Sequence, residues 1–228
     1  MSLDAITTWW QNNQRLTELL IEALGQTLTM VFVAGLIGFI IGIPLGVALH
    51  LTKKNGLWHN PLLNKTLGIV VNIGRSIPFI ILLVAIIPFT RFVVGSSIGT
   101  AAAIVPLTVG AIPFIARLVE GALLEIPAGL IEAAQAMGAT PVQIIVKVLL
   151  PEALPGIINA VTITLVTLIS YSAMAGTVGG GGLGDVGIRY GYQRFDGTVM
   201  AITVVMLVIL VQLIQSIGDH LVKRVDHR

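Results

Sequence analysis

The chain has 228 residues, of which 55% are hydrophobic and only 11% are charged. Soluble domains carry roughly 25% charged residues, so this composition excludes an ordinary soluble protein and indicates a multi-pass membrane protein. The net charge of +2 comes from scattered basic residues and does not indicate nucleic-acid binding, and the lack of cysteine excludes disulfides and thiolate metal sites.

Five apolar segments are long enough to cross a bilayer as helices, which takes about 20 residues each. We expect these spans at about residues 20–51, 67–89, 97–116, 156–178 and 197–217. No stretch between them is long enough for a separate core, so residues 1–228 are predicted to form one all-α membrane domain. Ahead of the first span, Trp9 and Trp10 suit a short interfacial helix, or else lie in a frayed terminus.

The first span carries a ridge of small residues at four-residue intervals, and Pro44 is expected to kink it. The ridge consists of Ala34, Gly38, Gly42 and Gly46. Small residues let a second helix approach closely where lipid provides no hydrophobic drive for association. We therefore expect this ridge to be a helix-packing face.

The second span contains Arg75, whose charge is costly in lipid, so its side chain must face protein, water or the inner interface. It is either a structural anchor or part of a transport pathway. Residues 88–97 are expected to form a short outer loop. The third span is expected to end at Arg117 and Glu120, directly before the next segment.

Residues 125–155 form an amphipathic segment between spans three and four, predicted to be two short helices. The apolar face of the first helix would consist of Ile126, Leu130, Ala133, Ala134 and Met137. That of the second would consist of Ile144, Ile145, Val148 and Leu149. Gly138 ends the first helix, Thr140 and Gln143 form a capping box for the second, and Pro151 with Pro155 should halt it.

The basic residues predict an orientation with the N-terminus outside and the C-terminus in the cytoplasm. Eight would then be cytoplasmic, namely Lys53, Lys54, Lys65, Arg117, Lys147, Lys223, Arg224 and Arg228. Four would be external, namely Arg15, Arg91, Arg189 and Arg194. The same orientation puts the segment 125–155 in the cytoplasm.

No enzymatic or metal chemistry is expected in this chain. Gly179 to Gly184 matches G-x-G-x-x-G formally, but it follows a membrane span rather than a strand, so it is predicted to be a flexible external turn. A phosphate-binding G-x-x-x-x-G-K-[ST] loop is absent from the sequence. The four histidines lack a metal-binding spacing, and Ser170 and Ser172 have no identifiable histidine and carboxylate partners.

A transport pathway needs polar groups only where they line a cavity. The candidates within the spans are Asn72, Arg75, Ser76, Ser170, Tyr171 and Ser172, with Met174 as a soft apolar liner. Each of these side chains could equally be a helix-packing contact.

The run Glu132-Ala133-Ala134, followed by Gly138 and then Val148 to Pro151, resembles the EAA signature of ABC importer permeases, with valine where the consensus has isoleucine. In that family the segment is a cytoplasmic coupling helix that docks into a groove on an ATPase subunit. The resemblance implies a type I importer fold. It assigns ATPase coupling to Glu132, Ala133, Ala134, Met137 and Gly138. Without it, the segment would be an amphipathic hairpin on the membrane surface.

Further runs, at residues 75–80, 110–117, 171–176 and 190–195, resemble the methionine-importer permeases. This resemblance implies a bacterial inner-membrane importer of D- and L-methionine that contains two copies of the permease. Two ATPase subunits would bind ATP and Mg²⁺, and an external methionine-binding lipoprotein would deliver the substrate. Asp185, Arg189 and Arg194 are candidates for docking that lipoprotein.

Other functions remain open at this point. A secondary transporter or channel would need no ATPase, but the chain lacks inverted hydropathy repeats and a series of intramembrane carboxylates. A membrane scaffold would show no substrate-dependent ATPase stimulation. Among importers, another amino acid or a small peptide could be the substrate.

Overall fold

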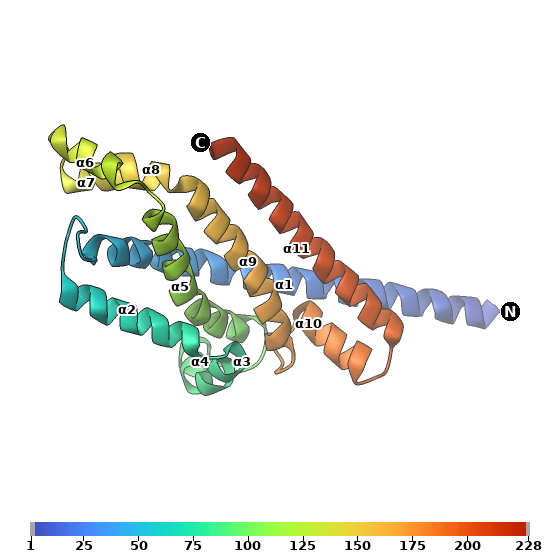
Figure 1. The fold of residues 1–228 in the computed structure, drawn as a ribbon. Coiled ribbons are helices and arrows are strands. Elements are labelled where there is room, and N and C mark those ends of the chain that lie inside the picture. The colour runs from blue at the N-terminus through green and yellow to red at the C-terminus, as the bar shows by residue number, and fades with distance from the viewer. Residues whose placement is uncertain (1–2, 227–228) are drawn as a thin grey trace.

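The computed structural model describes residues 3–226, and side chains from residue 14 onward, so the side chains of Trp9 and Trp10 lie outside the described residues. Every element of the described chain is helical (Figure 1). Four helices are long and apolar enough to cross a membrane: α1 (Leu3–Thr52), α5 (Thr100–Leu124), α9 (Leu154–Gly176) and α11 (Gly197–Val225). A bent pair, α2 (Pro61–Ser76) and α3 (Phe79–Ala85), makes a fifth, broken crossing. The predicted all-α membrane architecture is confirmed.

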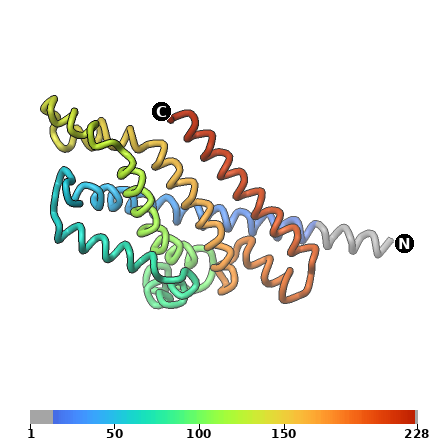
Figure 2. The backbone as a smooth tube through the Cα atoms, viewed as in Figure 1, coloured from blue at the N-terminus to red at the C-terminus, as the bar shows by residue number. Residues whose placement is uncertain are grey.

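The helices place short elements at two opposite ends of the bundle (Figures 1 and 2). One end holds the turn between α1 and α2, the end of α11, and the helices α6 (Ala128–Ala136), α7 (Pro141–Ile144) and α8 (Leu150–Glu152). The other holds α3, α4 (Ile87–Val94), α10 (Gly182–Val186) and the π-helix η2 (Gly187–Tyr192). We call these the hairpin end and the opposite end.

The small-residue ridge of α1 packs against α5, as expected. A Cβ atom on Gly42 would lie 2.8 Å from the Cβ of Ile115, and one on Gly46 would lie 2.8 Å from the Cβ of Val119. No real Cβ atom approaches so closely, so the two backbones meet here because these positions are glycine. The contact lies in the main core, where Ile115 and Val119 are each only 1% exposed.

The second span is broken, which corrects the prediction of one continuous crossing over residues 67–89. The axes of α2 and α3 differ by 99°. Pro78 restricts the residue before it to extended conformations, and Ile77 has φ −82° and ψ 121°. Pro78 also has no N–H to continue the hydrogen bonding of α2. The chain therefore turns sharply between Ser76 and Phe79.

Two further boundaries differ from the prediction. Much of the expected loop 88–97 is the helix α4, which ends at Gly95 in the left-handed conformation, with φ +80°. The helix α5 begins at Thr100 and continues past Arg117 to Leu124. Charge is tolerated there because Arg117 forms an ion pair with Glu120 one turn later, so these residues do not end the helix.

The glycine run after α9 is hydrogen-bonded to other spans rather than flexible, which corrects the expectation. The N–H of Gly182 donates to Oε1 of Gln26 at 2.7 Å, and the N–H of Leu183 donates to Oγ1 of Thr27 at 2.9 Å. The N–H of Gly99 donates to the carbonyl oxygen of Gly179 at 2.8 Å. Glycine is required because residues 179, 181 and 182 have φ near +80°. This pinned turn fastens α9 to α1 and α5.

Candidate functional site

The hairpin of α6 and α7 forms as the sequence predicts. Gly138 has φ +79°, and its N–H donates to the carbonyl of Gln135 at 2.9 Å, which closes α6. The capping box follows directly. The N–H of Thr140 donates to Oε1 of Gln143, and the N–H of Gln143 donates to Oγ1 of Thr140. Two local signals therefore fix a tight helix–turn–helix at this end of the molecule.

Pro151 does not halt the second helix, contrary to the prediction. A π-helix, η1 (Ile145–Leu149), follows α7, and the N–H of Leu150 donates to the carbonyl of Ile145. The wider turn lets the chain pass a residue that cannot donate to the carbonyl four positions earlier. Pro151 then lies in the first turn of α8, where its missing N–H costs little.

The two predicted apolar stripes differ in burial. In the second stripe Ile144, Ile145 and Leu149 are buried and Val148 is half-buried, as expected. In the first stripe only Ile126 and Ala134 are buried. Ala133 is exposed, Leu130 is 41% exposed, and Met137 is 81% exposed. The described chain therefore leaves most of the apolar face of α6 uncovered.

The five proposed coupling residues do not share one face of α6. Glu132 lines a pocket of about 450 Å³ between α6 and the turn after α1, together with Ala128, Gln135, Lys53 and Lys54. Residues 128, 132 and 135 share one helical face, whereas residues 133 and 137 project from the opposite side. Glu132 thus faces lysines of its own chain, while Met137 faces away from them.

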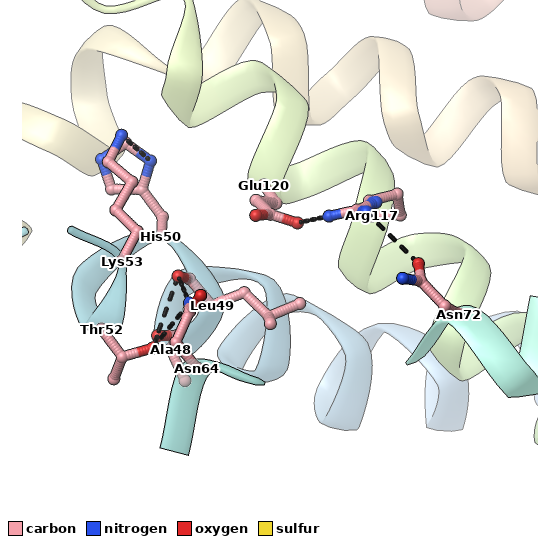
Figure 3. Close-up of polar contacts among 9 residues, drawn as sticks. All are labelled: Ala48, Leu49, His50, Thr52, Lys53, Asn64, Asn72, Arg117 and Glu120. Carbon is pink, nitrogen blue, oxygen red and sulfur yellow. Dashed lines mark hydrogen bonds and ion pairs between the residues drawn. The ribbon is translucent and has the colours of Figure 1, made fainter. Parts of the chain in front are cut away.

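A charged cluster beside this pocket was not predicted from the sequence. Figure 3 shows Glu120 and Arg117 of α5 paired, and Nη2 of Arg117 donates to Oδ1 of Asn72 on α2 at 3.2 Å. Partial burial lowers the pKa of the Lys53 ammonium, and the nearby carboxylate of Glu120 opposes that shift. Nδ2 of Asn64 donates to the carbonyl of Leu49 at 2.8 Å. The three-residue spacing of Arg117 and Glu120 on one helix was the sequence signal that could have predicted their ion pair.

Four pathway candidates, Asn72, Arg75, Ser76 and Tyr171, lie near the break between α2 and α3. Arg75 and Tyr171 line a cavity of about 170 Å³. The ring of Tyr171 stacks on Phe79, with centroids 4.3 Å apart and planes 3° from parallel. Oγ of Ser76 donates to the carbonyl of Asn72 at 2.8 Å. Residues distant in sequence therefore meet at this break.

The other three pathway candidates lie elsewhere. Ser170 and Met174 line a larger, mostly apolar pocket of about 580 Å³ between α9, η2 and α11. Ser172 is only 2% exposed, and its hydroxyl donates to the carbonyl of Ile169. The seven candidates therefore do not form a single site.

Charged residues at the opposite end have partners within the chain. Nη2 of Arg189 lies 2.9 Å from Oδ1 of Asp185, and the guanidinium of Arg194 lies 4.4 Å from the ring centroid of Tyr190. Among the side chains that the structure describes, from residue 14 to residue 226, no group of three or more His, Asp or Glu is placed to hold a metal ion.

The chain belongs to the family of binding-protein-dependent transport system inner membrane components, whose model matches residues 34–227. It is therefore a multi-pass membrane component of a bacterial ABC transporter. It is 69% identical to the "Probable D-methionine transport system permease protein MetI" of Vibrio cholerae over the full length of both chains. It is 65% identical to the "D-methionine transport system permease protein MetI" of Escherichia coli K12 over 69% of this chain and 73% of that protein.

Solved structures agree with this assignment. A chain of the MetNI methionine ABC transporter in an inward-facing conformation matches with a TM-score of 0.92 and 60% identity, covering 93% of this chain and 99% of that one. A chain of an amino acid ABC transporter with histidines matches with a TM-score of 0.77 and 17% identity, covering 98% and 100%. This second likeness concerns the fold alone.

Proposed function

We propose that this chain is the permease subunit of an ATP-driven importer of D- and L-methionine. The identity to the methionine permeases of Vibrio cholerae and Escherichia coli, and to the permease of the inward-facing methionine transporter, supports this substrate. A separate ATPase subunit binds ATP and Mg²⁺ and hydrolyses the ATP. An external methionine-binding lipoprotein delivers the amino acid, and the spans of two copies of this chain surround the pathway.

The exposed apolar face of the hairpin is the observation that supports docking on an ATPase subunit. Leu130, Met137, Val142 and Val146 are each more than 40% exposed, and they belong to α6, the turn after it, α7 and η1. Exposed apolar patches mark protein or membrane interaction sites, and we assign this one to an ATPase partner because the chain belongs to a family of ABC transporter components. The ATPase groove would receive Met137, with exposed Ala133 and Gly138 allowing close approach. Ala134 packs inside the chain, and Glu132 could reach the ATPase only from the side of the lysine pocket.

The distribution of charge supports the orientation. Lys53, Lys54, Lys147 and the end of α11 lie at the hairpin end, which would be cytoplasmic. Arg91 lies on α4 at the opposite end, which would face outward. Asp185, Arg189 and Arg194 share that outer end and remain candidates for docking the lipoprotein, although each already has an internal partner.

Transport would proceed by alternating access. Closure of the ATPase dimer on ATP draws the two hairpins together and shifts the spans from an inward-open to an outward-open state. The loaded lipoprotein then releases its amino acid, and hydrolysis resets the inward state. ATP and the lipoprotein must each bind one of these states more tightly, because a ligand with equal affinity for both shifts nothing.

Uptake of labelled methionine into proteoliposomes that contain the permease, ATPase and lipoprotein tests this proposal. The variant Met137→Glu should lose co-purification of the ATPase and ATP-dependent uptake, because it puts a charge into the apolar docking face. Leu62→Glu, at an exposed apolar position on α2 at the same end, should keep both. Equal loss in the two variants, or uptake without nucleotide, would contradict the proposal.

Orientation can be tested with single cysteines, because the natural chain has none. Met137→Cys and Phe92→Cys replace side chains that are 81% and 87% exposed at opposite ends. A membrane-impermeant thiol reagent should label residue 92 in intact cells and residue 137 only after the membrane is opened. The reverse pattern would show that the hairpin is external.

A further inference from the structure

The cavity at the break between α2 and α3 combines one cation with an aromatic wall. It has a volume of about 170 Å³, and its lining includes Arg75, Phe79, Phe114 and Tyr171. Pockets for drug-sized ligands measure roughly 300–1,000 Å³, so this cavity suits a smaller solute. Its position is unusual, because it lies where a membrane crossing is interrupted at Pro78. Broken helices at membrane depth line substrate sites in many transporters.

The guanidinium of Arg75 has no hydrogen-bond or ion-pair partner among the described residues. Its two nearest polar neighbours along α2 are engaged elsewhere. Ser76 donates to the carbonyl of Asn72, and the side chain of Asn72 accepts from Arg117. A charged side chain within a membrane crossing is costly unless it is paired or hydrated. A carboxylate is the partner that fits, since a guanidinium can bind it through two parallel hydrogen bonds.

The same break offers an acceptor and an apolar surface. Gly74 is one of the residues that line the cavity, and its carbonyl lacks the helical donor four residues later because Pro78 has no N–H. A carbonyl of this kind can accept from an ammonium group. The stacked rings of Phe79 and Tyr171, together with Phe114, provide the surface that thioether sulfur contacts favourably.

We propose that this cavity binds the transported amino acid as a zwitterion. Arg75 binds the carboxylate, the carbonyl of Gly74 accepts from the ammonium, and the aromatic wall contacts an unbranched apolar side chain. The proposal rests on the proposed function and adds a substrate site within each permease chain. Selection would then occur in the membrane as well as at the external lipoprotein.

Photo-crosslinking in the reconstituted complex tests this site. A diazirine analogue of methionine is irradiated with the complex, and the labelled peptides are identified by mass spectrometry. Labels should fall on peptides that contain Phe79, Phe114 or Tyr171. Excess methionine should compete, whereas methioninol, which lacks the carboxylate, should compete at least about tenfold less well, as expected for losing a charge-assisted hydrogen bond.

Arg75→Gln should reduce labelling about 10- to 100-fold and remove the preference for methionine over methioninol, while Arg75→Lys should retain part of both. Gly110→Ala narrows the cavity without a clash, since its Cβ would lie 3.4 Å from Leu82, and should weaken competition by methionine relative to alanine. Arg91→Gln, on exposed α4, is the matched control and should behave as wild type.

The possible results separate this site from the general function. Wild-type uptake with labels on other peptides, or labelling unchanged in Arg75→Gln, would overturn the cavity site and leave the importer intact. Dissociation of the two copies in Arg75→Gln would mean that the guanidinium holds a carboxylate of the second copy, which also overturns the site. Failure of the wild-type complex to take up methionine would instead reject the proposed function.

Discussion

Replacing a ridge glycine by alanine should destabilise the fold by crowding the contact between α1 and α5. On Gly46, the new methyl carbon would lie 2.8 Å from the Cβ of Val119 and 2.5 Å from the carbonyl oxygen of Ala116. The Ala116 oxygen belongs to the backbone, so it cannot move away as the end of a flexible side chain could. Gly25 lies on the same helix, and its Cβ would meet nothing within 4 Å. Gly25→Ala is therefore the matched control.

The difference between the two variants isolates the packing cost. Both gain the same helix propensity of roughly 1 kcal/mol, which cancels in the comparison. Overpacking costs about 1–3 kcal/mol. At about 2–4 °C per kcal/mol for a chain of this size, the midpoint of Gly46→Ala should lie roughly 2–12 °C below that of Gly25→Ala. Thermal unfolding of the purified permease in detergent measures this difference. Equal midpoints would refute the backbone contact.

Three further outcomes are expected in the same assay. Thr27→Val should cost about 1–3 kcal/mol because it leaves a buried backbone N–H in the pinned turn without an acceptor, whereas Thr29→Val, at an exposed position of the same helix, should change little. Gly138→Ala should cost about 1–2 kcal/mol through its positive φ, and a rise in stability would contradict that conformation. Glu120→Gln should lower the midpoint because Arg117 loses its carboxylate, and an unchanged midpoint would show that the pair contributes nothing.

Prolines show why the sequence predicted only part of the fold. Pro78 breaks a crossing, Pro106 and Pro113 lie inside α5 without ending it, and Pro151 is accommodated by a π turn. The residue type is the same in each case, but the surrounding packing decides whether the missing hydrogen bond ends the helix. The hairpin was predictable because its signals, such as the positive φ of Gly138, act over a few residues.

The candidate sites were also predictable only where local sequence signals define them. The coupling segment was located from a local pattern, but which of its faces is exposed depends on α1 and could not be read from periodicity alone. The stacking of Phe79 on Tyr171 joins residues that are far apart in sequence, so only the folded chain brings them together. Arg75 could be identified from the sequence because a charged residue in an apolar run is conspicuous there. The aromatic residues around it come from other helices and could not be identified in this way.

The pinned glycine turn also limits how the opposite end can open. Its backbone groups form hydrogen bonds with side chains of α1 and with the residue directly before α5. These bonds therefore connect α1, α5 and α9 at one membrane face. Separating α1 or α5 from the turn would break these hydrogen bonds and leave backbone N–H groups without acceptors. We therefore expect α1, α5 and α9 to move as one unit when a gate opens at that face. The hydrogen-bonded turn does not include α11 or the α2–α3 corner, so these elements can shift relative to that unit.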